Sequence, residues 1–308
     1  MNKFQQKGMA VVVAILLIAL ATSASALMLS RQDLWSRQVE NLATRAQADI
    51  VARAGIQAML QVMMNNPVSE NLQEIRAGAA TAMTALAVKG VTLNLVFTDA
   101  QANFNLNNLV RGDQASEPDV QAFRLLLTAA NLAPDLVNAV IDEIDSDSEA
   151  RLPGGAEDLD YLAMDPPRRA ANRPMTDATH LVRLKGYTPD AVSLLLPYVT
   201  ALPEPTLINV NSASAEALMA LAPGLDMETA KQLVAAREKT PFADTNAFRT
   251  QLPAGVTMTS IIPVGVTSRY FVVVSSARAG RIEVTYQALI GRQGAAQTGV
   301  IWRKQGGG

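Results

Sequence analysis

Cysteine is absent from this sequence, histidine occurs once, aromatic residues make up only 5%, and the formal net charge is −2. The lack of cysteine excludes a disulfide framework, a zinc ribbon and a thiol nucleophile. A charge so close to zero gives no overall basic field for gathering nucleic acid. Serine-hydrolase, phosphate-loop, dinucleotide-binding and zinc-protease motifs are missing, and the single histidine, His180, lies in a predicted helical segment. These absences disfavour an enzyme.

A long uncharged run lies close to the N-terminus, from Gly8 to Ser30, with Lys3 and Lys7 before it. Its 21-residue core, Met9–Leu29, would span about 31 Å as a helix, enough to cross a hydrocarbon core. The preceding lysines favour a cytoplasmic N-terminus. The same residues also fit a cleaved secretory signal, with a small-residue site ending at Ala26.

The residues that follow favour a retained anchor. From Arg31 to Asn65 there is no proline and only one glycine, Gly55. Apolar residues recur there at helical spacing: Trp35, Val39, Leu42, Ala46 and Ile50. Asn65-Asn66-Pro67 then predicts a stop. We therefore expect one continuous helix over 9–66, with 9–29 in the membrane, because a signal peptide has no reason to continue in phase into a rod.

The rest of the chain predicts a small sheet and many helices. Residues 91–97 alternate like a strand, and 269–276 and 281–290 predict an antiparallel hairpin around 277–280. Caps and breakers predict helices at 69–88, after Ser116, after Pro134, at 176–185, at 189–196 and twice within 206–252. A linker is expected at 202–205, and the tail Lys304–Gly308 is expected to lack regular structure.

An acidic loop lies between Asp142 and Asp160, with eight acidic residues against one base, Arg151. Oxygen-bearing side chains at alternating positions, returned by a Pro-Gly-Gly turn, suit a hard cation such as calcium. The EF-hand template fails, because Ala150 and Ala156 stand where it needs Gly and Glu. A solvated acidic loop without a cation is the other interpretation, and composition alone does not separate the two.

Residues 208–242 resemble a helix-hairpin-helix module of the kind found in competence DNA receptors. Such modules bind phosphates through backbone N–H groups of a P-G-[IV]-G turn. Here Asp226 stands in place of the second glycine, with Glu228 just behind it. Carboxylates there repel phosphate, and Asp226 is better suited to cap the next helix. We expect a packing unit.

Several motifs together indicate a family. A basic leader ending in Gly8, followed by a hydrophobic helix that becomes amphipathic, resembles the type IV prepilin and pseudopilin signature. I-D-S-D at 144–147 with G-A-E-D-L-D-Y at 155–161, the segment 166–174 (PPRRAANRP) and N-F-N-L-N-N-L at 103–109 resemble the K family of minor pseudopilins of type II secretion systems. Glu143 and Asn103 depart from it, standing where the family has Trp and Arg. The resemblance covers nearly the whole chain.

The resemblance implies an α+β, pilin-like fold, in which a long N-terminal helix packs on a small antiparallel sheet and carries a large all-helical insertion. The expected parts are a prepilin leader (1–8), the helix (9–66), a first pilin-like α/β part (67–112), the insertion with its acidic loop (113–205), the helix-hairpin-helix-like segment (206–260), and the C-terminal β-hairpin and tail (261–308).

The family also implies roles for particular residues. A prepilin peptidase would cut between Gly8 and Met9 and methylate the new N-terminus. Val13 occupies the position where most members of the superfamily carry a glutamate, a loss typical of the K family. The calcium-binding role carries over to the acidic residues Asp145, Asp147, Glu157 and Asp158, with Glu149 as a further candidate.

The implied function is structural. The chain would sit at the tip of the pseudopilus and initiate or cap its assembly for protein export across the outer membrane. It would be a single-pass inner-membrane protein with its bulk in the periplasm. Its partners would be the minor pseudopilins I and J, the major pseudopilin and the inner-membrane secretion platform. Two alternatives are an exported DNA-binding protein of the competence type and a secreted hydrolase released after Ala26.

Overall fold

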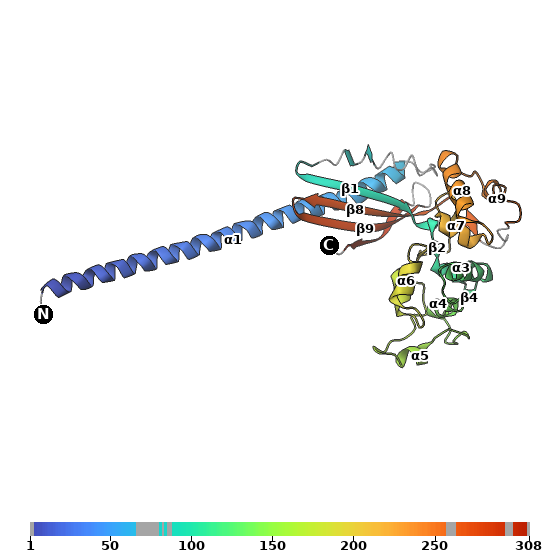
Figure 1. The fold of residues 1–308 in the computed structure, drawn as a ribbon, viewed down its shortest axis with the longest axis horizontal. Helices are drawn as coiled ribbons and strands as arrows, with labels where there is room; N and C mark the ends of the chain where they lie inside the picture. Colours follow the sequence, from blue (N-terminus) through green and yellow to red (C-terminus); the bar gives the residue numbers. More distant parts are fainter. Residues whose placement is uncertain are drawn as a thin grey trace.

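The computed structural model describes residues 3–65, 80–81, 83–84, 88–256, 263–292 and 298–306. Its first element is a single helix, α1 (Lys3–Asn65), whose 63 residues span about 95 Å. The N-terminal half of α1 projects clear of the rest of the molecule, which forms a head at the other end (Figure 1). The helix ends just before Pro67, as predicted. Most of the helix predicted at 69–88 lies outside the described residues.

A four-stranded antiparallel sheet forms the first part of the head, in the order β1-β8-β9-β10. Its strands are β1 (Val91–Asp99), β8 (Tyr270–Ala279), β9 (Ile282–Arg292) and β10 (Thr298–Gln305). The predicted hairpin is β8–β9, but its turn is tighter than expected, at Gly280-Arg281, where Gly280 adopts the positive φ that such turns require. The tail prediction was wrong for Lys304 and Gln305, because β10 pairs with β9 through Gln305.

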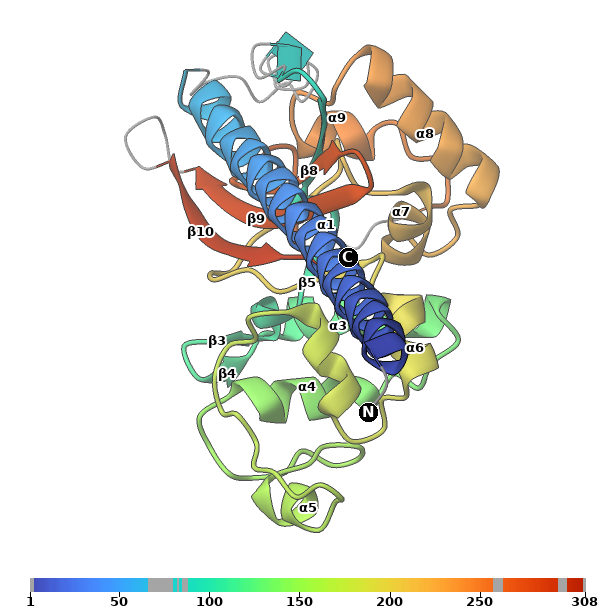
Figure 2. The ribbon, with the colours of Figure 1, turned by 90° about the vertical axis from the view of Figure 1, so that its left-hand side faces the viewer.

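The C-terminal half of α1 lies across this sheet (Figure 2). The helix face that packs on the sheet is made of small and unbranched side chains together with Val51 and Ile56: Ala48, Val51, Ala52, Ile56, Met59 and Met63. The helix approaches closely at Gly55, where a Cβ atom would lie 2.4 Å from Ser275 Oγ and 2.8 Å from Leu95 Cδ2. Gly55 thus permits the close contact between helix and sheet.

The apolar stripe that predicted an amphipathic helix does not face the sheet. Its large members are all exposed on α1: Trp35, Val39, Leu42 and Ile50. The C-terminal half of α1 therefore has two apolar faces. One is covered by the chain's own sheet, and the other is uncovered within the described residues.

The second part of the head is mostly helical and lies between β1 and β8 in sequence. Its helices are α3 (Glu117–Ala129), α4 (Leu136–Ile144), α5 (Asp158–Leu162), α6 (Pro189–Leu195), α7 (Ala215–Leu221), α8 (Met227–Lys239) and α9 (Thr245–Arg249). They are joined by three 3₁₀ helices: η1 (Ala100–Ala102), η2 (Leu106–Leu109) and η3 (Ala178–Arg183). Three short strand pairs also connect them: β2 (Phe104–Asn105) with β5 (Val199–Thr200), β3 (Val110–Arg111) with β4 (Gln114–Ala115), and β6 (Ile208–Asn209) with β7 (Val264–Gly265). The helix predicted at 176–185 is the shorter 3₁₀ helix η3, and α9 was not foreseen.

One hydrophobic core unites this second part. Phe104 of β2 stacks on Phe123 of α3, and the same core continues to Leu218 of α7 and Phe248 of α9. The acidic-loop region and the helix-hairpin-helix-like segment, distinct in sequence, therefore share one interior. From here on, the insertion means this whole unit, from Ala100 to Arg269, which is wider than the 113–205 expected from the sequence because it includes the helix-hairpin-helix-like segment.

A buried carboxylate joins the insertion to the sheet. Asp99, at the end of β1, accepts hydrogen bonds from four donors: Gln101 N, Asn209 Nδ2, Ser212 Oγ and Ser268 Oγ. Asp99 lies opposite Phe271 of β8, so the insertion leaves and re-enters the sheet at neighbouring strand ends.

Candidate cation site

The acidic loop runs from the end of α4 to the start of α5. Asp142, fully buried near the end of α4, organises it by accepting hydrogen bonds from Arg151 N (3.1 Å) and Ala156 N (2.8 Å). A Cβ atom on Gly155 would lie 2.2 Å from Asp142 Oδ2 and 2.3 Å from Arg151 O, so glycine is required there. This turn brings the residues after Gly155 back beside those after α4.

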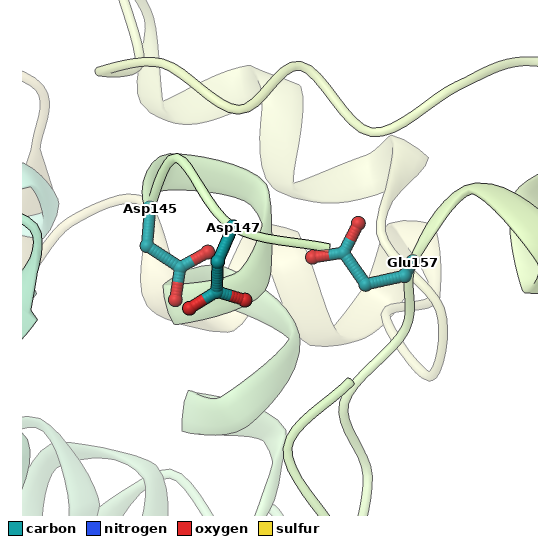
Figure 3. Close-up of side chains that lie close together, drawn as sticks. All are labelled: Asp145, Asp147 and Glu157. Atoms are coloured by element: carbon teal, nitrogen blue, oxygen red, sulfur yellow. The ribbon is translucent and has the colours of Figure 1, made fainter. Parts of the chain in front are cut away.

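The loop brings three of the predicted residues together. Asp145, Asp147 and Glu157 each place a carboxylate oxygen within 4.8 Å of the others (Figure 3). Asp145 is 2% exposed and Glu157 is 5% exposed. The carboxylate oxygens of both residues accept no hydrogen bond in the part of the chain that the structure describes. Buried carboxylates at such close range, without hydrogen bonds, are costly unless cationic charge compensates them.

The electrostatics of the cluster agree with its geometry. Burial, together with the charges of Asp142 and Asp145, raises the pKa of Glu157 to about 7. Burial also raises the pKa of Asp142 to about 6 and, with repulsion from Asp147, that of Asp145. The nearest base, Arg151, is 3.6 Å from Asp145 Oδ2 and 3.8 Å from Asp142 Oδ1, and so compensates only in part. Three carboxylates without nitrogen or sulfur donors suit a hard cation, so the cluster could hold a metal ion.

Two other predicted ligands have different surroundings. Asp158, the first residue of α5, accepts a hydrogen bond from Ala170 N (3.0 Å) and lies 3.4 Å from Arg169, outside the three-carboxylate cluster. Glu149 is exposed and is outside the three-carboxylate cluster. The sequence analysis did not identify Asp142 as the residue that positions the loop. An acidic residue on the apolar face of a predicted helix, upstream of a glycine pair, could have indicated that role.

Two residues of the helix-hairpin-helix-like segment disfavour phosphate binding. Asp226 caps α8 by accepting a hydrogen bond from Thr229 N (2.7 Å), and this bond lowers the pKa of Asp226. Arg237, a basic residue that could have faced DNA, points inward and donates to Val210 O and Ala213 O. Burial lowers its pKa to about 10. The turn therefore carries the carboxylate of Asp226, and Arg237, one of the few local cations, forms internal hydrogen bonds. Both features disfavour phosphate binding.

The N-terminal half of α1 has the properties of a membrane anchor. An 18-residue window of the helix has a mean hydropathy of 2.5, and none of that window is buried against the rest of the chain. Its apolar side chains are exposed, among them Val13, Leu16 and Leu20. The helix fits a single-pass membrane anchor.

A rod-like anchoring helix packed on an antiparallel sheet defines a membrane-anchored, pilin-like subunit, here with a large insertion and an acidic loop. Family models described as type II secretion system protein K match residues 102–204 and 208–266. The chain belongs to the protein K family of the type II secretion system. It is accordingly a minor pseudopilin, a structural component of that system.

Relatives in other bacteria match over most of their length. The type II secretion system protein K of Pseudomonas aeruginosa is 31% identical, over 89% of this chain and 85% of its own. That of Klebsiella pneumoniae is 30% identical, over 98% and 97%. Among solved structures, the fold is similar to a chain in the GspK-GspI-GspJ complex of enterotoxigenic Escherichia coli. That match has a TM-score of 0.74 at 23% identity, covering 88% of this chain and 100% of that one.

Proposed function

We propose that this minor pseudopilin occupies the tip of the pseudopilus and initiates or caps its assembly, with the minor pseudopilins I and J as lateral partners and the major pseudopilin beneath. The observation that carries the proposal is the uncovered apolar face of α1. Trp35, Val39 and Leu42 are exposed there, on the stretch of α1 that precedes the residues covered by the sheet. Burying this face against partner helices is favourable, at about 25 cal/mol per Å².

The insertion supports a terminal position. It extends the head at the end of α1 remote from the anchor (Figure 1). A further subunit added above would have to pack its own helix where this bulk lies. Val13 supports the same position, because a pilin glutamate in the membrane needs a partner amine, and a subunit with no neighbour above it has none to pair with.

The membrane topology follows from the anchor. Lys3 and Lys7 precede the apolar half of α1, which favours an inner-membrane helix with the head in the periplasm. We expect a prepilin peptidase to cut between Gly8 and Met9 and leave the anchor intact. The secretion platform in the same membrane would then receive the processed subunit.

The acidic cluster supports calcium as the resident cation. Asp145, Asp147 and Glu157 would hold it. Bound calcium would supply the positive charge that compensates these carboxylates and would fix the loop against α4. Magnesium demands a more nearly ideal octahedral site and dehydrates reluctantly, so a flexible loop of carboxylates favours calcium.

The test of the function uses a host in which the gene for this chain is deleted. We expect type II secretion to stop and to return when the wild-type chain is supplied. Leu42→Asp should fail to restore secretion and should lose co-purification with I and J from detergent-solubilised membranes, because it places a carboxylate on the uncovered face. Arg37→Asp, on the other side of the helix, is the control. Normal secretion and co-purification with Leu42→Asp would contradict the proposal.

A further inference from the structure

A second charged site is lined by Glu143 of α4 and by residues between α5 and α6. It is a cavity of about 320 Å³, and its lining includes four arginines against one carboxylate: Arg168, Arg169, Arg173, Arg183 and Glu143. His180 lies in the same lining. In a chain whose net charge is −2, four guanidinium groups around one cavity are a local reversal of sign.

Arg168 serves as part of the wall. Its guanidinium stacks on Tyr161 at 3.5 Å, forms an ion pair with Glu143 at 3.0 Å and donates to Arg183 O (3.2 and 3.0 Å). The one carboxylate of the lining is therefore neutralised inside the wall. The donors that remain for a ligand belong to the other three arginines.

The wall segment is also held from behind. Ala170 N donates to Asp158 Oδ1 (3.0 Å), and Asn172, at φ 45°, donates from Nδ2 to Asp147 O (2.7 Å). Arg173 N donates to Glu143 O (3.3 Å). The backbone of the segment that carries Arg169 and Arg173 is thus fixed by contacts to the acidic loop and to the end of α4.

Two of the arginine side chains are free of contacts to hydrogen-bonding or charged groups of the described residues. The side chains of Arg173 and Arg183 are exposed and make no hydrogen bond or ion pair with any residue that the structure describes. Arg169 is 76% exposed in its side chain and has only a long contact, 3.4 Å, with Asp158. Guanidinium groups bind carboxylates through paired N–H donors, in a geometry that lysine does not offer.

We propose that this cavity binds an acidic peptide segment of another protein, with a carboxylate side chain between Arg173 and Arg183. The lining also contains apolar surface from Pro174 and Met175, which suits the stem of an aspartate or glutamate and its neighbours. A polyanion such as nucleic acid is disfavoured, because the acidic loop continues directly behind the wall. The proposal does not rest on the tip position.

The test uses the full chain in detergent micelles and two labelled, capped pentapeptides, Ala-Glu-Ala-Glu-Ala and Ala-Gln-Ala-Gln-Ala. We expect the glutamate peptide to bind about tenfold or more tightly than the glutamine peptide. Arg173→Ala/Arg183→Ala should remove that difference. Lys231→Ala/Lys239→Ala, which deletes two exposed charges from α8, should keep it. The arginine variant should melt like the wild type, since neither side chain has an internal partner.

Three results would overturn the proposal: no binding of either peptide at millimolar concentration, equal binding of both, or unchanged binding by the arginine variant. Inorganic phosphate is the further competitor. If phosphate displaces the glutamate peptide at equal concentration and with the same arginine dependence, the cavity is a general anion site and the peptide assignment is wrong.

Discussion

Two regions of this molecule bury carboxylates in opposite ways. Asp99, where β1 meets the insertion, accepts four hydrogen bonds from Gln101, Asn209, Ser212 and Ser268. Glu157, in the acidic loop, is buried to a similar degree but accepts none within the described residues. Protein donors satisfy the first carboxylate, whereas the second would need a ligand from outside. Donor content, rather than burial, separates a structural carboxylate from a cation site.

The largest effect is expected at the satisfied carboxylate. Asp99→Ala leaves four donors without their acceptor inside the protein and should lower the free energy of unfolding by about 3–5 kcal/mol. Denaturant unfolding of the full chain should give the same loss with calcium and with chelator. Asp99→Asn, which keeps the shape and one acceptor oxygen, should lose less. A loss that appears only in calcium would show that the two regions are coupled.

A smaller effect is expected from the cation. At calcium a hundredfold above its dissociation constant, binding to Asp145, Asp147 and Glu157 should stabilise the folded chain by about 3 kcal/mol relative to chelator. Asp145→Asn/Glu157→Gln should abolish that difference, and Glu149→Gln should preserve it. Thermal melting with and without calcium measures both. If Glu149→Gln removes the calcium effect as well, the ligand set is larger than the cluster.

The metal-free chain should also respond to pH. The pKa values of Glu157 and Asp142 are about 7 and about 6 in the folded chain, above their ordinary values of 4.5 and 3.8. The folded state therefore binds protons more strongly than the unfolded state. The stability from these two groups is fully present below about pH 4 and is lost as the pH rises through 7.

The melting temperature in chelator should accordingly fall between about pH 5 and pH 8, and saturating calcium should suppress the fall because it stabilises the charged carboxylates. Asp145→Asn/Glu157→Gln in chelator retains Asp142, so it should lose most of the Glu157 contribution and still show the smaller fall that comes from Asp142 and the other titrating groups. A wild-type profile that matches that of this variant would contradict the assignment of the unsatisfied carboxylates.

The smallest effect is expected at a solvent-facing carboxylate. Asp177, at the start of η3, forms a 2.7 Å ion pair with Lys304 of β10, and so links the insertion to the sheet. Burial alone would raise the pKa of Asp177, but the hydrogen bonds from Lys304 and Thr179 lower it to about 2. Lys304→Ala should cost no more than about 1 kcal/mol in denaturant unfolding. Lys239→Ala, an exposed lysine of α8, is the control; a larger loss would show that the link is structural.

The sequence predicted the parts of this fold that local patterns determine. Alternation gave the β8–β9 hairpin, and Asn65-Asn66-Pro67 gave the end of α1. The predictions that failed depended on distant contacts. Lys304 and Gln305 looked like a loose tail, because their order comes from pairing with β9. The stripe through Trp35 and Leu42 is real, but only the structure shows that the sheet covers another face of the helix.

The candidate site was predicted to a similar extent. Alternation after α4 and the return after Gly155 indicated Asp145, Asp147 and Glu157. The same pattern could not exclude Asp158, since one residue of advance along the chain turns its side chain toward Arg169. Nor could it identify Asp142 as the residue that organises the turn, because its two backbone donors lie nine and fourteen residues away.

The point at which the insertion joins the sheet has a consequence for how such proteins diversify. β1 ends at Asp99 directly opposite Phe271 of β8, so the chain departs and returns at the spacing of an ordinary hairpin. In topology, the whole insertion is a very long loop between two paired strands. Domains grafted in this manner can be lengthened, exchanged or lost while the register of the underlying fibre-forming unit stays the same.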